Sequence, residues 1–178
     1  ERDKFLGVMD GLGIRLGPLI LQFPYFNKDA FSSAAPFMEK LDRFLEDLPN
    51  DFKYGVEIRN PHWLKKEFVE LCRKYNVALV LVDQSWMPHG DEVEKMFDPV
   101  TTDFTYIRLL GDRQKIEKIT KKWDKEVLDY SERMNRWVEF LHRMVEREIF
   151  ALVYANNHYA GHAPMTARRM REMFLSND

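Results

Sequence analysis

Hydrophobic residues gather in five short runs along the chain, and longer amphipathic stretches separate them. The runs cover residues 19–23, 52–59, 77–82, 104–110 and 150–155. Their lengths and their content of Val, Ile and Leu predict β-strands. Apolar residues recur at three- and four-residue spacing over residues 3–12, 30–48, 61–75, 126–147 and 164–174, which predicts helices. Residues 84–100 are expected to be loop-like with room for one helical turn, and residues 112–125 to be a charged connection. The predicted order is therefore one helix followed by five strand–helix units.

The predicted strands are almost continuously apolar, as in VALVLV at residues 77–82. Such runs are typical of parallel strands that are covered on both faces. Two α/β architectures remain open. One is an open, doubly wound sheet of five strands. The other is the last five units of a TIM-type parallel β/α barrel, which normally needs about 250 residues. The leading helix favours the partial barrel, because it implies a strand before it. We expect residues 1–178 to form a single domain, a fragment that lacks the first three β/α units.

Composition and charge narrow the class of protein. The 178 residues include 27 basic and 29 acidic side chains, for a formal net charge of -2. No excess of positive charge is available to attract nucleic acid or anionic lipid. No apolar run has the length of a membrane span, and no signal peptide is recognisable. The single cysteine, Cys72, lies on an apolar helical stripe and is expected to be a core thiol in a reducing compartment. These features predict a cytoplasmic protein.

Polar side chains stand at the carboxyl end of every predicted strand. They are Gln22 after the first strand, Glu57 and Arg59 after the second, Asp83 after the third, Arg108 in the fourth, and Asn156, Asn157 and His158 after the fifth. Ligands of both candidate architectures bind at this end of the strands. The sequence therefore predicts a polar pocket there.

Glu57 and Arg59 are two residues apart and share one face of their strand. An acid buried there is costly unless it is paired, and Arg59 or Arg108 is a suitable partner. In the functional interpretation, Glu57 is a general acid or base and the arginines hold an anionic or polyhydroxylated ligand. In the structural interpretation, the same groups form a closed ion-pair network. Both remain open.

Other chemistries have weaker support. Glu57, Asp83, His158 and His162 are possible metal ligands, but no HxH, HExxH or DxD spacing accompanies them, so no metal site is predicted. The three arginines of residues 168–171 lie inside the last helix, away from the N-terminus that would bind phosphate. The lysines of residues 118–125 surround Trp123, but neighbouring acids cancel most of their charge.

Several ordered motifs together resemble one known family. They are LGPLILQFP, GVEIRNPHW, ALVLVD, FTYIRLLGDR and VYANNHYAGHAPMTARRMREM. From about Gly17 to the C-terminus, the chain is similar to domain-of-unknown-function family 72, the YecE-like proteins. The resemblance implies a TIM-type barrel, of which this chain would supply strands four to eight. The family has no established reaction that the resemblance could transfer. What the resemblance implies is positional: the family pattern is matched by the motif residues Gln22, Pro24, Glu57, Arg59, Trp63, Asp83, Arg108, Gly111, Asn156 and Asn157.

Three functional hypotheses follow. The first is an enzyme or binder of a small polar ligand, sugar-like or phosphorylated, at the C-terminal mouth of the barrel. Glu57 and Asp83 are its candidate catalytic residues. Its candidate ligand-binding residues are Gln22, Arg59, Arg108, Asn156, Asn157 and His158. The second is a non-catalytic binding or adaptor barrel with a sealed polar network. The third and weaker one is a metal-dependent sugar-phosphate or nucleic-acid enzyme. The expected partners are a small molecule and the missing N-terminal segment; the cofactor is unknown.

Overall fold

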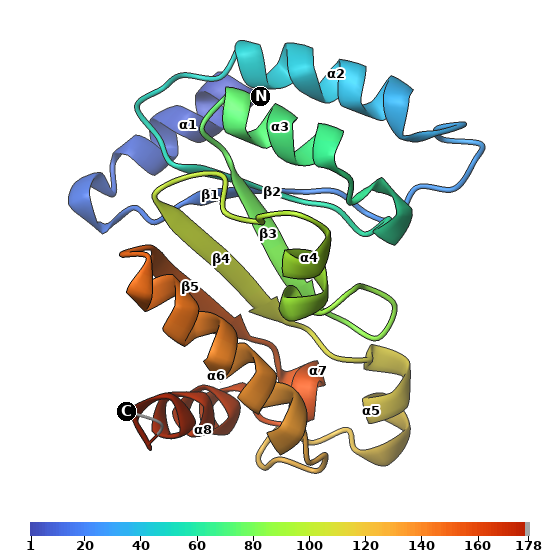
Figure 1. Cartoon of the computed structure of the whole chain (residues 1–178), viewed down its shortest axis with the longest axis vertical. Coiled ribbons are helices and arrows are strands. Elements are labelled where there is room, and N and C mark those ends of the chain that lie inside the picture. Colours follow the sequence, from blue (N-terminus) through green and yellow to red (C-terminus); the bar gives the residue numbers. More distant parts are fainter. Residues whose placement is uncertain (177–178) are drawn as a thin grey trace.

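The computed structural model describes residues 1–176, in which five strands form one all-parallel sheet (Figure 1). The strands are β1 (Leu19–Gln22), β2 (Tyr54–Glu57), β3 (Ala78–Asp83), β4 (Phe104–Leu109) and β5 (Phe150–Ala155). All five strands predicted from the apolar runs are confirmed. Their order in the sheet is β1-β2-β3-β4-β5, so neighbours in sequence are neighbours in space. A doubly wound sheet reverses its order partway across, so that alternative is wrong for this chain.

The helices differ from the predictions mainly at their ends and in the two supposed loops. They are α1 (Arg2–Asp10), α2 (Ala34–Glu46), α3 (Lys66–Lys74), α4 (Gly90–Met96), α5 (Arg113–Ile119), α6 (Ser131–Glu146), α7 (Asn157–Ala160) and α8 (Ala163–Ser176). The helix predicted from residue 126 begins only at Ser131, because the N–H groups of Val127 and Leu128 donate to the Ala160 carbonyl. Pro61 begins a short 3-10 turn, Pro61–Trp63, and α3 follows it.

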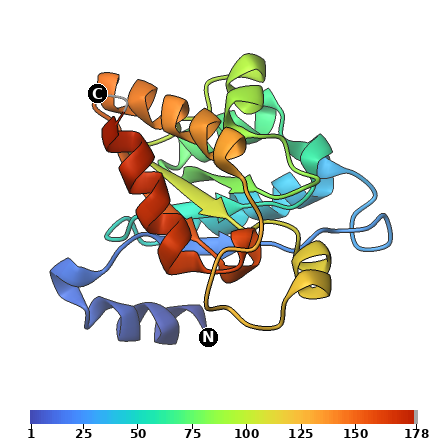
Figure 2. The same cartoon turned by 90° about the horizontal axis from the view of Figure 1, so that it is seen from below.

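The two faces of the sheet have different environments. One face, here called the inner face, carries a small cluster of Val80, Val82 and Leu110 with Ile20 and Tyr106, and no helix residue belongs to that cluster. The other face, here called the outer face, packs against the helices in a much larger core. In Figure 2, α6 and α8 cross the same side of the sheet. The helices therefore cover one face, and the inner face is lined by strand side chains.

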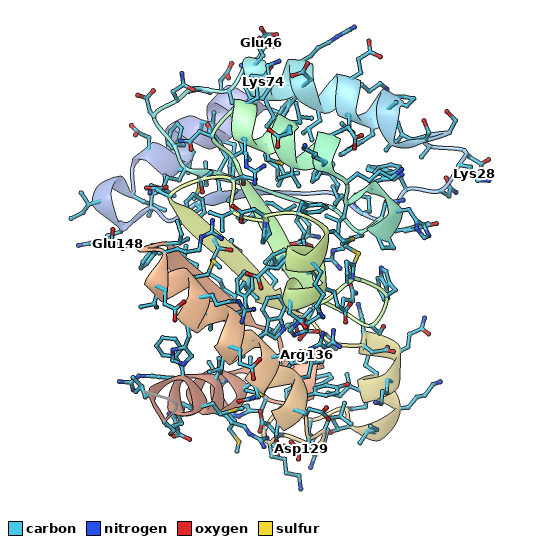
Figure 3. The ribbon with its side chains drawn as sticks, viewed as in Figure 1. Lys28, Glu46, Lys74, Asp129, Arg136 and Glu148 are labelled. Atoms are coloured by element: carbon cyan, nitrogen blue, oxygen red, sulfur yellow. The ribbon has the colours of Figure 1, made fainter. Side chains whose placement is uncertain are left out.

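The outer core is built from the apolar stripes that predict the helices. Phe68 of α3 and Trp137 of α6 are both fully buried. Cys72 is buried there too, and burial raises the pKa of its thiol to about 12, which confirms the expected core thiol. Many charged side chains lie at the periphery, as Figure 3 shows for Lys28, Glu46 and Glu148, whereas Glu57 and Asp83 are buried. Within residues 1–176, none of the helices combines the length and apolar character needed to span a bilayer.

Candidate functional site

Four of the predicted site residues meet on the inner face, at the carboxyl ends of β1, β2 and β4. Glu57 accepts hydrogen bonds from two guanidinium groups: Arg59 Nε donates to Oε1 at 2.5 Å, and Arg108 Nη1 donates to Oε2 at 2.5 Å. Arg108 Nη1 also donates to Gln22 Oε1 at 2.5 Å. Gln84, just after β3, accepts from Arg59 Nη1 at 2.6 Å. We call these five side chains the inner-face cluster.

The orientation of Glu57 follows from strand alternation. Gly55 precedes it by two residues, and a Cβ at Gly55 would lie 2.8 Å from Ile20 Cδ1 and 2.9 Å from Val80 Cγ2. Both contacts belong to the inner face, so Gly55 and Glu57 point to the side away from the helices. The Glu57 side chain is fully buried, while those of Arg59 and Arg108 are 14% and 26% exposed.

The inner-face cluster carries an excess of one positive charge, because two guanidinium groups face a single carboxylate. Arg59 uses all three of its nitrogens on Glu57 and Gln84. Arg108 uses only Nη1, and within residues 1–176 its Nε and Nη2 have no hydrogen-bond partner. Both oxygens of Glu57 are occupied, so proton transfer by Glu57 would require a guanidinium group to leave. The arrangement is therefore suited to receiving an anion at Arg108.

A pair of tyrosines lies beside Arg108 on the inner face. Tyr154 of β5 is the register partner of Arg108, and its ring stacks on that of Tyr106 at a centroid distance of 4.9 Å. Tyr154 is half exposed. Burial raises the pKa of the Tyr106 phenol above its ordinary value, with the Tyr154 phenol as the next cause. Tyr106 thus keeps its proton, and the pair offers an aromatic surface next to a cation.

Asp83 does not join the inner-face cluster. Val80 and Val82 face inward, so Asp83, one residue further along β3, faces outward toward α6. Its Oδ1 accepts from Arg133 Nε at 2.5 Å. Its Oδ2 accepts from Trp137 Nε1 at 2.7 Å and from the Tyr159 hydroxyl at 2.9 Å. Asp83 is a second polar centre on the opposite face of the sheet.

The Tyr159 hydroxyl acts as a donor to Asp83. Burial raises the pKa of this phenol far above its ordinary value, and the adjacent Asp83 carboxylate raises it further. The neutral phenol and the indole of Trp137 thus both donate to the carboxylate, and both residues are fully buried. Asp83 joins β3 to α6 and α7, which is a structural role that the sequence did not indicate.

The three polar residues after β5 organise their own turn. Asn156 Oδ1 accepts from the backbone N–H of His158 at 2.9 Å and caps α7, a short helix that the sequence did not predict. Asn157 Oδ1 accepts from the Ala163 N–H at 2.8 Å. His158 Nε2 lies 3.3 Å from Glu117 Oε1. The His158 ring contacts the Trp123 ring edge-on, with a distance of 4.8 Å between the ring centroids. The structure gives these side chains no contact with the inner-face cluster.

Arg133, Trp137 and Tyr159 are site residues that sequence reasoning missed. Arg133 and Trp137 are four residues apart in the predicted helix, so they lie on the same helix face. When an arginine and a tryptophan lie on the core-facing side of a helix, their N–H groups need a buried hydrogen-bond acceptor. The pattern therefore indicates that such an acceptor is present. That signal does not identify Asp83 as the acceptor, which is 50 residues away from Arg133.

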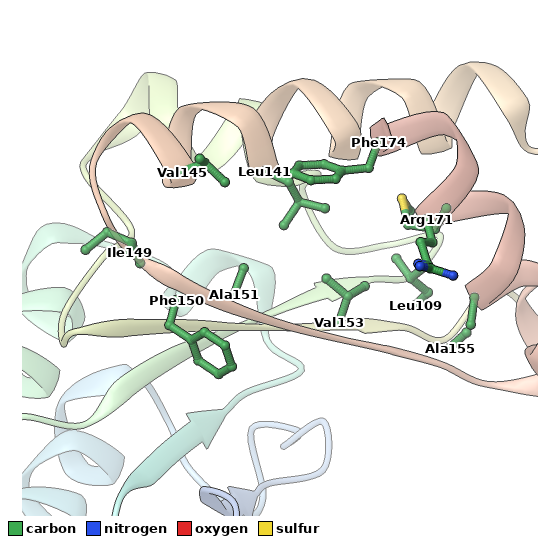
Figure 4. Close-up of a pocket in the computed structure, with 12 residues that line it drawn as sticks. Leu109, Leu141, Val145, Ile149, Phe150, Ala151, Val153, Ala155, Arg171 and Phe174 are labelled. Atoms are coloured by element: carbon green, nitrogen blue, oxygen red, sulfur yellow. The ribbon is translucent and has the colours of Figure 1, made fainter. Parts of the chain in front are cut away.

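Within residues 1–176, no three His, Cys, Asp or Glu side chains are grouped so as to hold a metal ion. An apolar groove of about 400 Å³ runs between β5, α6 and α8, and Figure 4 shows Leu141, Val153 and Phe174 in its walls. A second apolar groove, of about 570 Å³, lies beside β1 and α2. Neither groove contains Glu57, Arg108 or Asp83.

Gly111 holds the loop between β4 and α5 in a conformation that needs glycine. Its φ is +68°, and a Cβ would lie 2.4 Å from the His158 carbonyl oxygen and 2.6 Å from Tyr159 Cα. We expect Gly111→Ala to lower the free energy of unfolding by about 3 kcal/mol, because both the backbone conformation and the contact are unfavourable. Urea unfolding measures this. Gly17→Ala, with nothing within 4 Å of its Cβ, is the control and should change stability by less than about 1 kcal/mol.

Comparison with known proteins gives the family. A search of curated proteins found no match. A DUF72 family protein (TM1631) from Thermotoga maritima MSB8 is 23% identical with a TM-score of 0.70, over 97% of this chain and 64% of that one. A DUF72 family protein (EF0366) from Enterococcus faecalis V583 is 19% identical with a TM-score of 0.63, over 98% of this chain and 67% of that one. The chain thus spans about two thirds of the length of each. The model for "Protein of unknown function DUF72" matches residues 1–177. The chain belongs to the DUF72 family.

Proposed function

We propose that the inner-face cluster binds a small anionic ligand, phosphorylated or acidic and sugar-like. The observation that carries the proposal is the free side of Arg108, whose Nε and Nη2 have no partner within residues 1–176. The surplus positive charge of the cluster favours an anion at this position. The aromatic rings of Tyr106 and Tyr154 would border the apolar part of the ligand.

The residues have distinct roles in this proposal. Arg108 binds the anionic group, and the Gln22 amide nitrogen offers a donor beside it. Glu57 orients both guanidinium groups and is a positioning residue, since its two oxygens are already occupied. Arg59 fixes Glu57 from the other side and links it to Gln84. Asp83, Asn156, Asn157 and His158 do not contact the ligand.

A second candidate is a non-catalytic adaptor whose polar strand ends form a sealed network. The complete burial of Glu57, with both oxygens bonded, favours it. In this candidate, the cluster joins β1, β2 and β4 through their side chains. The residual 26% exposure of Arg108 then has no function.

We propose further that the sheet is part of the wall of a TIM-type β/α barrel. The sequential strand order and the placement of helices on one face support this, because both are features of barrel walls. The site would then lie where barrels bind ligands, at the carboxyl ends of the strands. An experimental structure of the protein with a flat sheet would contradict the barrel.

The ligand proposal is tested by titration calorimetry with glucose 6-phosphate, glucose and inorganic phosphate. We expect binding of glucose 6-phosphate and phosphate, and none of glucose. Arg108→Gln should weaken phosphate binding at least about tenfold, because a hydrogen bond to a charged group contributes roughly 1.5–3 kcal/mol. Arg113→Gln on α5, whose side chain is 74% exposed, is the matched control and should bind normally. Absent binding, or equal binding by Arg108→Gln, would favour the sealed network.

A further inference from the structure

A small cavity of about 230 Å³ lies on the outer side of the sheet, at the carboxyl ends of β3 and β4. Its walls come from four segments: Asp83 at the end of β3 and Ser85 after it, Gly111 and Asp112 before α5, Tyr130 and Arg133 at the start of α6, and Tyr159 of α7. The cavity is smaller than the roughly 300–1,000 Å³ of pockets for drug-sized ligands. It shares no residue with the inner-face cluster.

Arg133 is held so that one edge of its guanidinium group stays free. Its Nε donates to Asp83 Oδ1, and Asp83 is fixed in turn by Trp137 and Tyr159. Within the described part of the chain, Nη1 and Nη2 of Arg133 have no hydrogen-bond or ion-pair partner. Two parallel N–H groups on one guanidinium edge match the two oxygens of a carboxylate. Because the hydrogen bond from Nε already orders the Arg133 side chain, binding a carboxylate to Nη1 and Nη2 costs less conformational entropy.

Asp112 adds an opposite charge to the lining of the same cavity. Its Oδ1 accepts from the Lys115 N–H at 3.0 Å and caps α5. Among residues 1–176, no cation lies within ion-pair distance of Asp112. The left-handed conformation of Gly111 holds this aspartate in position. A simple anion bound to Arg133 would be repelled by Asp112, and a simple cation at Asp112 would leave the Arg133 edge unused.

We propose that this cavity binds a small zwitterion, an α-amino acid, with its carboxylate on the Nη1/Nη2 edge of Arg133 and its ammonium group beside Asp112. Each ligand charge then faces an opposite charge of the protein. Ser85 and the Tyr130 ring form the remaining walls and restrict the ligand to a short side chain. This site is independent of the proposed anion site, which lies on the other face of the sheet.

The test is titration calorimetry of the 178-residue chain with glycine, L-alanine and L-serine. Propionate and ethylamine are the comparison ligands, since each retains one of the two charges. We expect at least one amino acid to bind tenfold or more tightly than either comparison ligand. Arg133→Lys keeps a cation beside Asp83 but loses the two-nitrogen edge, and should weaken that binding at least tenfold.

Asp112→Asn supplies an independent second variant. Asparagine caps helices as well as aspartate does, so α5 is retained while the charge is lost. It too should weaken amino-acid binding at least tenfold. Arg136→Lys is the matched control, because Arg136 lies on the same helix and pairs with Asp91 and Glu92 outside the cavity. Amino acids that bind no better than propionate, or binding that both cavity variants leave unchanged, would overturn the proposal.

Discussion

Replacing Asp83 with alanine is expected to lower the free energy of unfolding by about 4 kcal/mol. The substitution leaves the Trp137 indole N–H and the Tyr159 hydroxyl without an acceptor, and both residues are fully buried. A buried donor that loses its acceptor costs roughly 1–3 kcal/mol. The Arg133 guanidinium, 31% exposed, loses its counter-charge as well. Equilibrium unfolding in urea, followed by tryptophan fluorescence, measures the change.

Asp42 offers a matched control for this prediction. Its Oδ1 accepts from Lys74 Nζ at 2.8 Å and from the Tyr75 hydroxyl at 2.7 Å, so it also pairs with one cation and one phenol. Its side chain is 41% exposed, however, and water can replace both bonds. Asp42→Ala should therefore leave the free energy of unfolding almost unchanged. Equal effects at Asp42 and Asp83 would mean that burial does not give the Asp83 centre its importance.

Replacing Glu57 with glutamine is expected to lower the free energy of unfolding by about 3 kcal/mol. The amide is uncharged and has one acceptor oxygen, whereas Glu57 accepts from both Arg59 and Arg108 with separate oxygens. Two guanidinium groups would then face each other without a carboxylate between them. The same unfolding experiment measures the loss, with Glu39→Gln as the control.

Glu39 pairs with Arg43 on the surface of α2, where its side chain is 67% exposed. Its replacement should cost at most about 0.5 kcal/mol, as for other exposed pairs at this spacing. If Glu57→Gln were as stable as the parent chain, the inner-face cluster would not be a structural centre. The expected loss also has a consequence for functional work: reduced activity in Glu57→Gln is not by itself evidence that Glu57 transfers protons.

The structure separates two acidic residues that look equivalent in the sequence. Glu57 and Asp83 both follow apolar strands and are equivalent candidates in the sequence. In the structure they lie on opposite faces, and each is paired with at least one arginine. The free guanidinium atoms belong to Arg108 on one face and Arg133 on the other. In both proposals the ligand is therefore bound by an arginine that a carboxylate holds in place.

The sequence by itself determined the five strands, the five longer helices and their order, but not α4, α5 and α7. Strands of four to six residues and amphipathic helices arise from the spacing of apolar residues within a short window, and this spacing can be read directly from the sequence. The burial of Cys72 and the pairing of Glu57 with Arg59 were also predictable, because a stripe of three-four spacing and a two-residue separation are local too.

Only the tertiary structure decided which face each strand end presents. The strand ALVLVD is apolar on both faces. Its sequence therefore does not show that Val82 points to the inner face and Asp83 to the outer face. That choice depends on which side the helices pack. The partners of Asp83 come from α6 and α7, 50 to 76 residues later, and Arg108 reaches Gln22 across 86 residues. Contacts between such distant residues depend on sheet order and helix placement, and these arise from packing the whole chain.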